Sequence, residues 1–219
     1  MRPDHLIAIA GTGTDVGKTW VARGLVAGLR GTAVTVAVRK PAQSFAPGDD
    51  DAGITDAHLL AVASGEDPRR VTPPHRWYPA PLAPPMAADV LGLPAFGVAD
   101  LVRELEQSWD SGARIGIIET AGGLRSPIAD DGDCLDLILA ARVERVVLVA
   151  DAGLGVIHDV RVCAAALADV HLPVIVMLNR FAAAAPYATH ARNAAWLARR
   201  EGLDVVTDIE ALTARCATA

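Results

Sequence analysis

The chain has 219 residues, of which 52% are hydrophobic and 4% aromatic, and its formal net charge is −6 at pH 7. This length suits a single α/β domain over residues 1–219. The negative charge argues against nucleic acid or an anionic membrane surface as the main partner, and no apolar run reaches the roughly 18–20 residues that span a bilayer. Three widely spaced cysteines fit neither a disulfide framework nor a zinc knuckle. Because the N-terminus also has no features of a signal peptide, we expect a protein of the cytoplasm.

Short apolar runs alternate with helical patterns along the chain. The runs are rich in β-branched residues, which is typical of strands buried in a parallel sheet, and they cover residues 6–10, 34–38, 115–118, 146–150 and 174–178. Predicted helices follow at residues 18–29, 56–63, 98–109, 134–141, 158–169 and 187–201. This order predicts an α/β fold with a doubly wound, mostly parallel sheet flanked by helices. The proline-rich stretch 67–94 cannot form a long helix and is expected to be an ordered flap or an edge.

Only two of the twenty basic residues are lysines, Lys18 and Lys40. A lysine carries a compact point charge, whereas an arginine presents a wide planar fork. Lys18 lies near the end of a glycine-rich run, and Lys40 follows the second predicted strand. Both positions favour ammonium groups that hold an oxyanion, with compositional bias as the alternative.

Residues 11–19, Gly-Thr-Gly-Thr-Asp-Val-Gly-Lys-Thr, stand between the first predicted strand and the first predicted helix. This is typical of a Walker A loop, in which backbone N–H groups and the helix N-terminus point at phosphate oxygens. Lys18 is expected to reach the β- and γ-phosphates of ATP, and the Thr19 hydroxyl to bind Mg²⁺. The spacing is a variant, because Thr12 stands where the strict pattern has glycine, and no lysine precedes Lys18 as it does in partitioning ATPases. The loop predicts a fold of the P-loop NTPase type.

Polar side chains follow the predicted strands at the edge where a doubly wound sheet binds its ligands. Lys40, Glu119, Asp151 and Asn179 each come just after an apolar run. We therefore expect these side chains to converge with the phosphate loop on one rim. Asp151 is either a supporting group behind the site or a helix cap.

Magnesium on a triphosphate prefers hard oxygen ligands, usually including one or two carboxylates. Glu119 has glycines close by, in the run Glu-Thr-Ala-Gly-Gly, which let a phosphate approach. The second carboxylate is either Asp56 or one of the three aspartates at residues 49–51. Asp56 begins a predicted helix and could instead be an N-cap, and the aspartate run could instead be a solvated loop.

Six runs of the chain, taken in order, form a more specific combination than the phosphate loop alone. They are residues 11–19, 39–44 (Arg-Lys-Pro-Ala-Gln-Ser), 56–57 (Asp-Ala), 78–84 (Tyr-Pro-Ala-Pro-Leu-Ala-Pro), 119–123 (Glu-Thr-Ala-Gly-Gly) and 154–155 (Leu-Gly). This combination resembles the dethiobiotin synthetase family across nearly the whole chain. The resemblance implies an ATP- and Mg²⁺-dependent cyclo-ligase of biotin biosynthesis. It would add CO₂ to one amine of 7,8-diaminononanoate (7,8-diaminopelargonate), activate the carbamate as a carbamic–phosphoric anhydride, and close the ring to dethiobiotin, releasing ADP and phosphate.

The resemblance also implies roles for individual residues. Lys40 would hold the carbamate and the transferring phosphoryl group, Lys18 the β- and γ-phosphates, and Thr14 would lie beside the reacting amines. The implied ATP-binding residues are Gly13, Thr14, Asp15, Val16, Gly17, Lys18, Thr19, Trp20, Asp56, Glu119, Thr120, Ala121, Gly122, Asn179 and Arg180. The implied substrate-binding residues are Ser44, Lys40, Leu154, Gly155 and His158, and the implied Mg²⁺ ligands are Thr19, Asp56 and Glu119. The implied partners are ATP, the diamine, CO₂ or bicarbonate, and a second copy of the chain, with substrate at the subunit boundary.

Several positions depart from the family pattern, mostly on the substrate side. Phe45 and Thr120 stand where the family has glycine, and His158 replaces an asparagine. Asp15 replaces a glutamate or glycine, and the proline-rich adenine segment is not evident at residues 208–213. The first alternative is therefore a paralogous P-loop ligase that acts on another small amine or carboxylate. A partitioning-type ATPase switch is the second alternative, but the missing loop lysine and the Lys-Pro pair argue against it.

Overall fold

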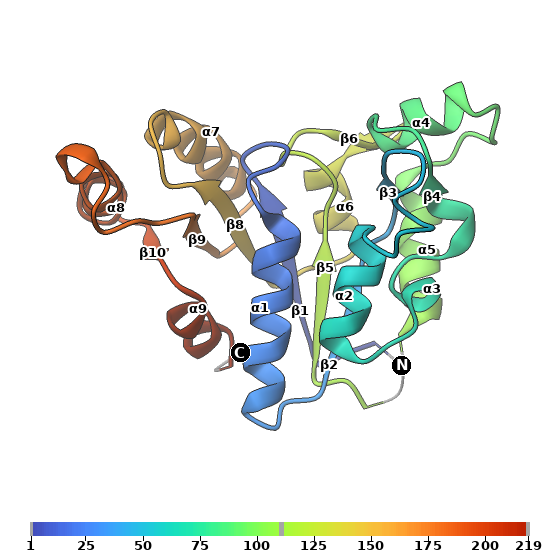
Figure 1. Cartoon of the computed structure of the whole chain (residues 1–219), viewed down its shortest axis with the longest axis horizontal. Helices are drawn as coiled ribbons and strands as arrows, with labels where there is room; N and C mark the ends of the chain where they lie inside the picture. Colours follow the sequence, from blue (N-terminus) through green and yellow to red (C-terminus); the bar gives the residue numbers. More distant parts are fainter. Residues whose placement is uncertain (1, 110–111, 218–219) are drawn as a thin grey trace.

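A computed structural model describes residues 2–109 and 112–217, so five residues of the range 1–219 lie outside the described part. The centre is a six-stranded sheet in the order β10-β9-β8-β1-β5-β2, and all neighbouring strands are parallel (Figure 1). The strands are β1 (His5–Gly11), β2 (Val36–Arg39), β5 (Ile115–Glu119), β8 (Arg145–Asp151), β9 (Val174–Asn179) and β10 (Asp204–Val206). The predicted α/β fold with a doubly wound parallel sheet is confirmed.

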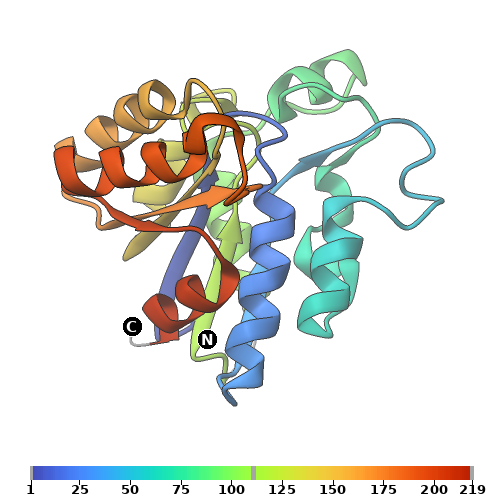
Figure 2. The same ribbon diagram turned by 60° about the vertical axis from the view of Figure 1, so that its left-hand side comes forward.

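Side chains of β1 alternate between two apolar cores on the two faces of the sheet. Leu6, Ala8 and Ala10 belong to one core, and Ile7 and Ile9 belong to the other. Residues of α5, α6, α7 and α8 complete the first core, and residues of α1, α2 and α9 complete the second (Figures 1 and 2). The helices are α1 (Lys18–Gly31), α2 (Asp56–Ser64), α5 (Val98–Ser108), α6 (Cys134–Ala140), α7 (Val156–Asp169), α8 (Thr189–Arg200) and α9 (Ile209–Ala217).

The proline-rich stretch 67–94 is ordered and folds into short elements. They are α3 (Pro68–Val71), the 3₁₀ turn η1 (Pro74–Arg76), β4 (Trp77–Tyr78) and α4 (Pro84–Val90). Prolines occupy the first positions of the helical pieces, where the missing N–H costs nothing. β4 pairs with β3 (Gln43–Ser44), and a second small sheet joins β6 (Pro127–Ala129) to β7 (Gly132–Asp133).

Some predicted boundaries differ from the observed ones. The second strand covers Val36–Arg39 and not residues 34–38, because the turn after α1 runs through Ala33 in the left-handed region (φ 63°). α7 begins two residues before His158, directly after Gly155, whose φ of 96° suits glycine. Neither β10 nor α9 was predicted, and β10 has only three residues, which is too short for a pattern to stand out.

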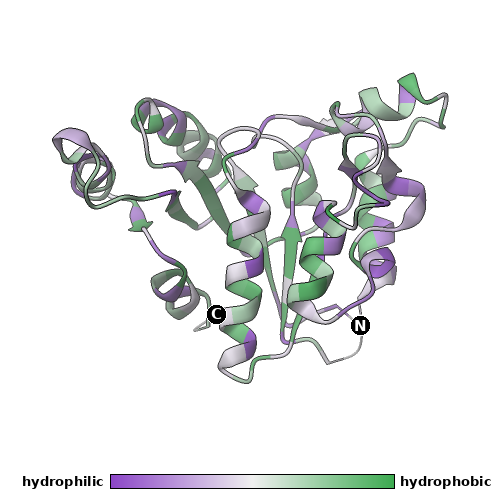
Figure 3. Cartoon of the chain, viewed as in Figure 1, coloured by the Kyte–Doolittle hydropathy of each residue, from purple (hydrophilic) through white to green (hydrophobic). Residues whose placement is uncertain are grey.

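The carboxyl ends of the strands meet at one rim of the sheet. Figure 3 shows apolar colouring along the central strands and more polar colouring in the loops above them. Across the rim, Ile9 is in register with Glu119, and Asp151 with Asn179. In the described part of the chain, no helix combines the length and the apolar character that crossing a bilayer requires.

Candidate active site

The phosphate loop joins β1 to α1 and bends sharply before the helix begins. Asp15 (φ 58°) and Gly17 (φ 92°) both lie in the left-handed region. A Cβ atom at Gly17 would lie 2.0 Å from the Asn179 Nδ2 atom, so only glycine fits there. The Lys18 Nζ atom donates to the Gly13 carbonyl oxygen at 3.1 Å, which folds the lysine back over the loop. The loop is therefore shaped and charged for a phosphate group.

Two residues at the end of β9 tie down the outer side of this loop. Asn179 Nδ2 donates to the Val16 carbonyl oxygen at 2.9 Å, and an Arg180 guanidinium nitrogen donates to the Asp15 carbonyl oxygen at 2.7 Å. The other terminal nitrogen of Arg180 pairs with Asp151 at 2.8 Å. Asn179 and Arg180, which the resemblance places among the ATP-binding residues, thus hold the phosphate loop in place, and Asp151 supports Arg180.

Thr19 lies between Glu119 and Asp56, which is one of the two alternatives for the second carboxylate. Its Oγ1 atom is 2.8 Å from Asp56 Oδ1 and 2.9 Å from Glu119 Oε1. Asp56 is the first residue of α2, but the cap position belongs to Thr55, so the interpretation of Asp56 as an N-cap is wrong. None of the aspartates at residues 49–51 lines the cavity described below. The second carboxylate that contacts Thr19 is therefore Asp56.

Lys40 bridges the same two carboxylates. Its Nζ atom is 2.6 Å from Asp56 Oδ2 and 2.7 Å from Glu119 Oε1, and the residue is only 3% exposed. Its backbone is fixed on both sides, because Lys40 N–H donates to the Val71 carbonyl oxygen and the Thr72 hydroxyl donates to the Lys40 carbonyl oxygen. The proline-rich segment thus holds the lysine at the rim.

Burial disfavours every charge in this cluster, and pairing decides where each pKa lies. Desolvation opposes the charge on Lys40, yet Asp56 and Glu119 outweigh it, so its pKa lies above the ordinary value. Desolvation also opposes the charge on Asp56, but Lys40 and Thr19 hold its pKa below the ordinary value. Burial raises the pKa of Glu119, and Lys40 offsets part of that rise. Burial and repulsion from Lys40 lower the pKa of Lys18, so an anion beside the two lysines would stabilise both.

The residues around Thr19 fit a magnesium ion. They offer a hydroxyl and two carboxylates, which are hard oxygen ligands. Glu119 is fully buried, and its Oε2 atom has no hydrogen-bond partner, which is costly unless a ligand completes it. No group of three or more His, Cys, Asp and Glu side chains in the described residues is placed to hold a metal. Two carboxylates are few for a protein-only site, so the set suits a Mg²⁺ ion that also keeps phosphate and water ligands.

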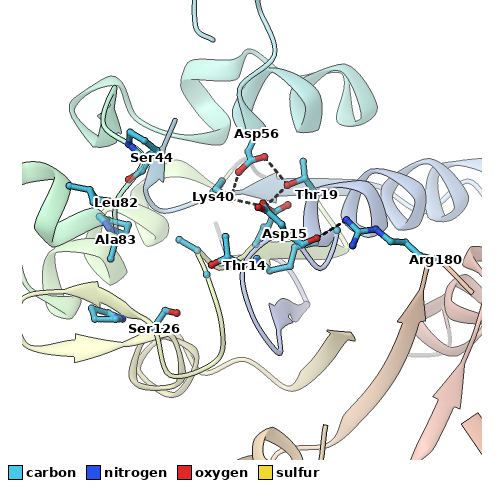
Figure 4. A pocket seen from close by; sticks show the side chains of 18 residues that line it. Thr14, Asp15, Thr19, Lys40, Ser44, Asp56, Leu82, Ala83, Ser126 and Arg180 are labelled. Atoms are coloured by element: carbon cyan, nitrogen blue, oxygen red, sulfur yellow. Dashed lines mark hydrogen bonds and ion pairs between the residues drawn. The ribbon is translucent and has the colours of Figure 1, made fainter. Parts of the chain in front are cut away.

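These groups open onto a cavity of about 700 Å³ at the rim (Figure 4). Figure 4 shows Thr19, Lys40 and Asp56 on one side of it and Leu82, Ala83 and Ser126 on the other. Of the residues predicted for the site, the cavity is lined by Thr14, Asp15, Gly17, Lys18, Thr19, Lys40, Ser44, Asp56, Glu119, Ala121, Gly122 and Arg180. The cavity is also lined by residues 81–84, Ser126 and Pro127, for which no role was predicted. The Pro-Leu-Ala-Pro run was a signal for the first group, whereas Ser126 and Pro127 carry no local pattern.

Other predicted site residues do not line this cavity. Gly13 and Val16 contribute carbonyl oxygens to the contacts above, and Asn179 donates to one of them. Thr120 is buried beneath the rim and Trp20 is 57% exposed on α1. The remaining three lie at the start of α7, and they are Leu154, Gly155 and His158.

The position next to Ser44 departs from the family pattern without narrowing the cavity. The Phe45 ring packs edge-on against Trp77, with 6.2 Å between ring centroids, and does not line the cavity. Ser44 itself lines the cavity, and its buried Oγ atom has no hydrogen-bond partner. A hydroxyl in that state is ready to bond a ligand.

Solved structures with a similar fold share little sequence. The septum site-determining protein MinD from Pyrococcus horikoshii, complexed with Mg-ADP, matches with a TM-score of 0.52 and 15% identity, over 93% of this chain and 79% of that one. A chain of the MinC:MinD cell division protein complex from Aquifex aeolicus matches with a TM-score of 0.54 and 14% identity, over 92% of this chain and 79% of that one. At these identities the likeness concerns the fold alone, which is that of P-loop NTPases.

Sequence comparison identifies nearer relatives. The family model described as "AAA domain" matches residues 5–214. An ATP-dependent dethiobiotin synthetase from Rhodococcus jostii is 36% identical over 163 residues, which are 74% of this chain and 67% of the relative. Another from Haloferax mediterranei is 38% identical over 179 residues, 81% of this chain and 72% of the relative. The chain therefore belongs to the ATP-dependent dethiobiotin synthetase family, and it is an enzyme of the ligase class.

Proposed function

We propose that this protein is an ATP- and Mg²⁺-dependent cyclo-ligase that converts 7,8-diaminononanoate and CO₂ to dethiobiotin, with ADP and phosphate as the other products. One observation carries the proposal: the only two lysines of the chain line a single cavity, together with Thr19, Asp56 and Glu119. Phosphoryl transfer depends mostly on positioning and on stabilising negative charge. The relatives named as dethiobiotin synthetases support the choice of substrates.

The phosphate loop and Lys18 would bind the triphosphate of ATP. The Lys18 ammonium is bonded to a carbonyl oxygen of the loop, and burial together with Lys40 disfavours its charge. Phosphate oxygens would replace that weak contact by a charge-assisted one, which is stronger. Thr19, Asp56 and Glu119 would hold Mg²⁺, which supplies charge neutralisation for the phosphates.

Lys40 and Ser44 would hold the acceptor on the other side of the cavity. One amine of the diamine adds to CO₂ and loses a proton to give a carbamate. A carbamate oxygen then attacks the γ-phosphorus, ADP leaves, and the neighbouring amine attacks the anhydride carbon and expels phosphate. Lys40 would stabilise the negative charge that the carbamate and the transferring group share. Pro81, Leu82 and Pro127 offer an apolar wall for the hydrocarbon chain of the diamine.

We also propose that the enzyme works as a homodimer with substrate at the boundary between two chains. Leu154, Gly155 and His158 do not line the cavity of their own chain, so the contact with substrate that the family resemblance implies would need a second chain. Leu154 is 98% exposed, so its side chain is accessible to a second chain. Light scattering after gel filtration should give a dimer of the 22.8 kDa chain, and Leu154→Arg should shift it toward monomer. A monomeric wild-type enzyme with full activity would contradict this.

The decisive experiment is turnover with the diamine, bicarbonate and ATP, with dethiobiotin detected by mass. Product and ADP should appear together, and omission of either the diamine or bicarbonate should abolish both. ADP release without either would point to another acceptor or to a switch. Lys18→Arg should weaken ATP binding strongly in a calorimetric titration, because a planar fork does not fit the place of a point charge in the loop.

A further inference from the structure

The ammonium of Lys40 sits where the proposed function puts a metal ion. It lies 2.6 Å from Asp56 and 2.7 Å from Glu119, and these are the two carboxylates that also flank the Thr19 hydroxyl. Both Lys40 contacts go to the metal ligands themselves, and the Glu119 Oε1 atom is shared by Lys40 and Thr19. The lysine that the reaction needs at the phosphoryl group is therefore held on the metal carboxylates.

We propose that Lys40 is the resident cation of the metal site, which it occupies until nucleotide binds. In the nucleotide-free protein its ammonium neutralises Asp56 and Glu119 in place of a divalent ion. When phosphate oxygens enter the cavity, Lys40 withdraws from the carboxylates to the phosphates and opens the site to metal. This inference rests on the proposed function for the identity of the metal ligands, but not for the identity of the acceptor.

Charge explains why metal alone should not displace the lysine. A divalent ion that binds between Asp56 and Glu119 would stand beside a buried ammonium, and repulsion between close charges is strong in a buried site. Lys40 has little freedom to leave, because it is only 3% exposed. Only an anion between the two lysines gives Lys40 a second place to go.

The unpartnered oxygen of Glu119 points to the same exchange. Glu119 is 0% exposed, and its Oε2 atom has no partner although Lys40 and Thr19 both bond Oε1. A monovalent ammonium thus leaves one buried carboxylate oxygen unsatisfied. The cluster therefore lacks one contact that a ligand can add, as expected of a stand-in cation.

The type of residue suits this role. A lysine has a flexible four-carbon stem and a compact head, so it can move from the carboxylates to the phosphate oxygens. Its neighbour Arg39 shows the contrast, because its guanidinium is fixed by Glu66, Ser108 and the Val38 carbonyl oxygen. An arginine at position 40 could not withdraw without carrying a planar group through the cavity.

The test is the affinity of the nucleotide-free protein for Mn²⁺, measured by electron paramagnetic resonance at constant ionic strength. Lys40→Met should bind Mn²⁺ at least ten times more tightly than the wild type. Lys18→Met is the matched control: it removes a positive charge from the same cavity, but that charge contacts a carbonyl oxygen and not the carboxylates. Its affinity should stay within about threefold of the wild type. Equal gains in the two variants, or no gain in Lys40→Met, would overturn the proposal.

Thermal melting gives a second readout for a variant that folds poorly. Without a divalent ion, Lys40→Met and Lys40→Gln should melt at lower temperature than the wild type, because two carboxylates then lack a counter-charge. Millimolar Mg²⁺ should restore most of this loss, whereas NaCl of equal ionic strength should not. Variants that Mg²⁺ fails to restore would overturn the inference. If the exchange is found but no dethiobiotin forms in the turnover assay, the acceptor is wrong and the role of Lys40 stands.

Discussion

Arg39 and Lys40 are neighbours at the end of β2, and both are buried cations, at 1% and 3% exposure. Arg39 belongs to a closed cluster with Glu66 and Ser108, in which its guanidinium bonds a carboxylate at 2.6 Å, a hydroxyl at 2.9 Å and a carbonyl oxygen at 2.6 Å. The Trp109 ring covers it, with its centroid 4.9 Å from the guanidinium carbon. All of these partners belong to the protein itself.

Lys40 belongs to an open cluster with Thr19, Asp56 and Glu119. This cluster borders a cavity and leaves one carboxylate oxygen unpartnered. The two clusters use the same kinds of charge, so buried charge alone does not identify a functional site. What distinguishes them is whether the hydrogen-bonding capacity of the buried groups is used up within the protein. A closed cluster holds the fold together, and an open cluster is ready for a ligand.

The largest expected effect is on turnover, in the open cluster. Lys40→Arg should lower kcat roughly 1,000-fold, because the planar fork cannot follow the transferring phosphoryl group as a point charge can. The affinity for ATP and the free energy of unfolding should change little. Steady-state kinetics measure kcat, and a nucleotide titration measures the affinity for ATP. A variant that loses ATP binding, or keeps full turnover, would show that Lys40 does not act on the transferring group.

The reciprocal exchange should affect stability and not turnover. Arg39→Lys keeps the charge but loses the contacts with Ser108, so we expect the free energy of unfolding to fall by about 2 kcal/mol. Arg39→Met should cost about 3 kcal/mol, because it leaves the partly buried Glu66 carboxylate without its ion-pair partner. Urea unfolding gives both values, and turnover per folded molecule should stay within about twofold. A drop in kcat with unchanged stability would show that Arg39 acts in turnover and not in holding the fold together.

A third, half-buried pair should show an intermediate effect with a defined pH dependence. Burial opposes the charge on Glu104, but Arg76 and His75 hold its pKa below the ordinary value. Its stabilising effect is therefore complete above the unfolded-state pKa of about 4.3 and is lost as the pH falls through the lower folded-state pKa. Glu104→Gln should cost about 1–2 kcal/mol at pH 7 and should reduce the loss of stability on acidification. If the variant loses as much stability at acidic pH as the wild type does, Glu104 does not contribute to the pH dependence of folding.

The smallest effect is expected for an exposed pair. Arg161 and Glu201 lie 3.3 Å apart, and the arginine side chain is 62% exposed. Surface pairs of this kind contribute little, so Arg161→Gln should change the free energy of unfolding by less than about 0.5 kcal/mol. Urea unfolding of Arg161→Gln in low and high salt measures this change, with which the changes in the other variants can be compared. A loss comparable to that of Arg39→Lys would mean that burial does not separate these pairs.

The fold was predictable where the signal is local. Continuous β-branched runs marked five of the six strands of the sheet, and the glycine spacing marked the phosphate loop between β1 and α1. Strand β10 escaped because three residues carry no clear period. The choice between Asp56 and residues 49–51 stayed open for a different reason: spacing along the chain does not say which carboxylate returns to Thr19. The packing of α2 beside α1 made that choice.

By itself, the sequence determined that a phosphate loop follows the first strand of a parallel α/β sheet, and that two lysines stand where an anion would bind. Only the tertiary structure decided that adjacent cations have opposite roles. Successive side chains of an extended strand point to opposite faces, so Arg39 reaches Ser108 on α5 while Lys40 reaches Asp56 and Glu119 at the cavity. The environment of each cation is assembled from segments far apart in the chain, which no local pattern records.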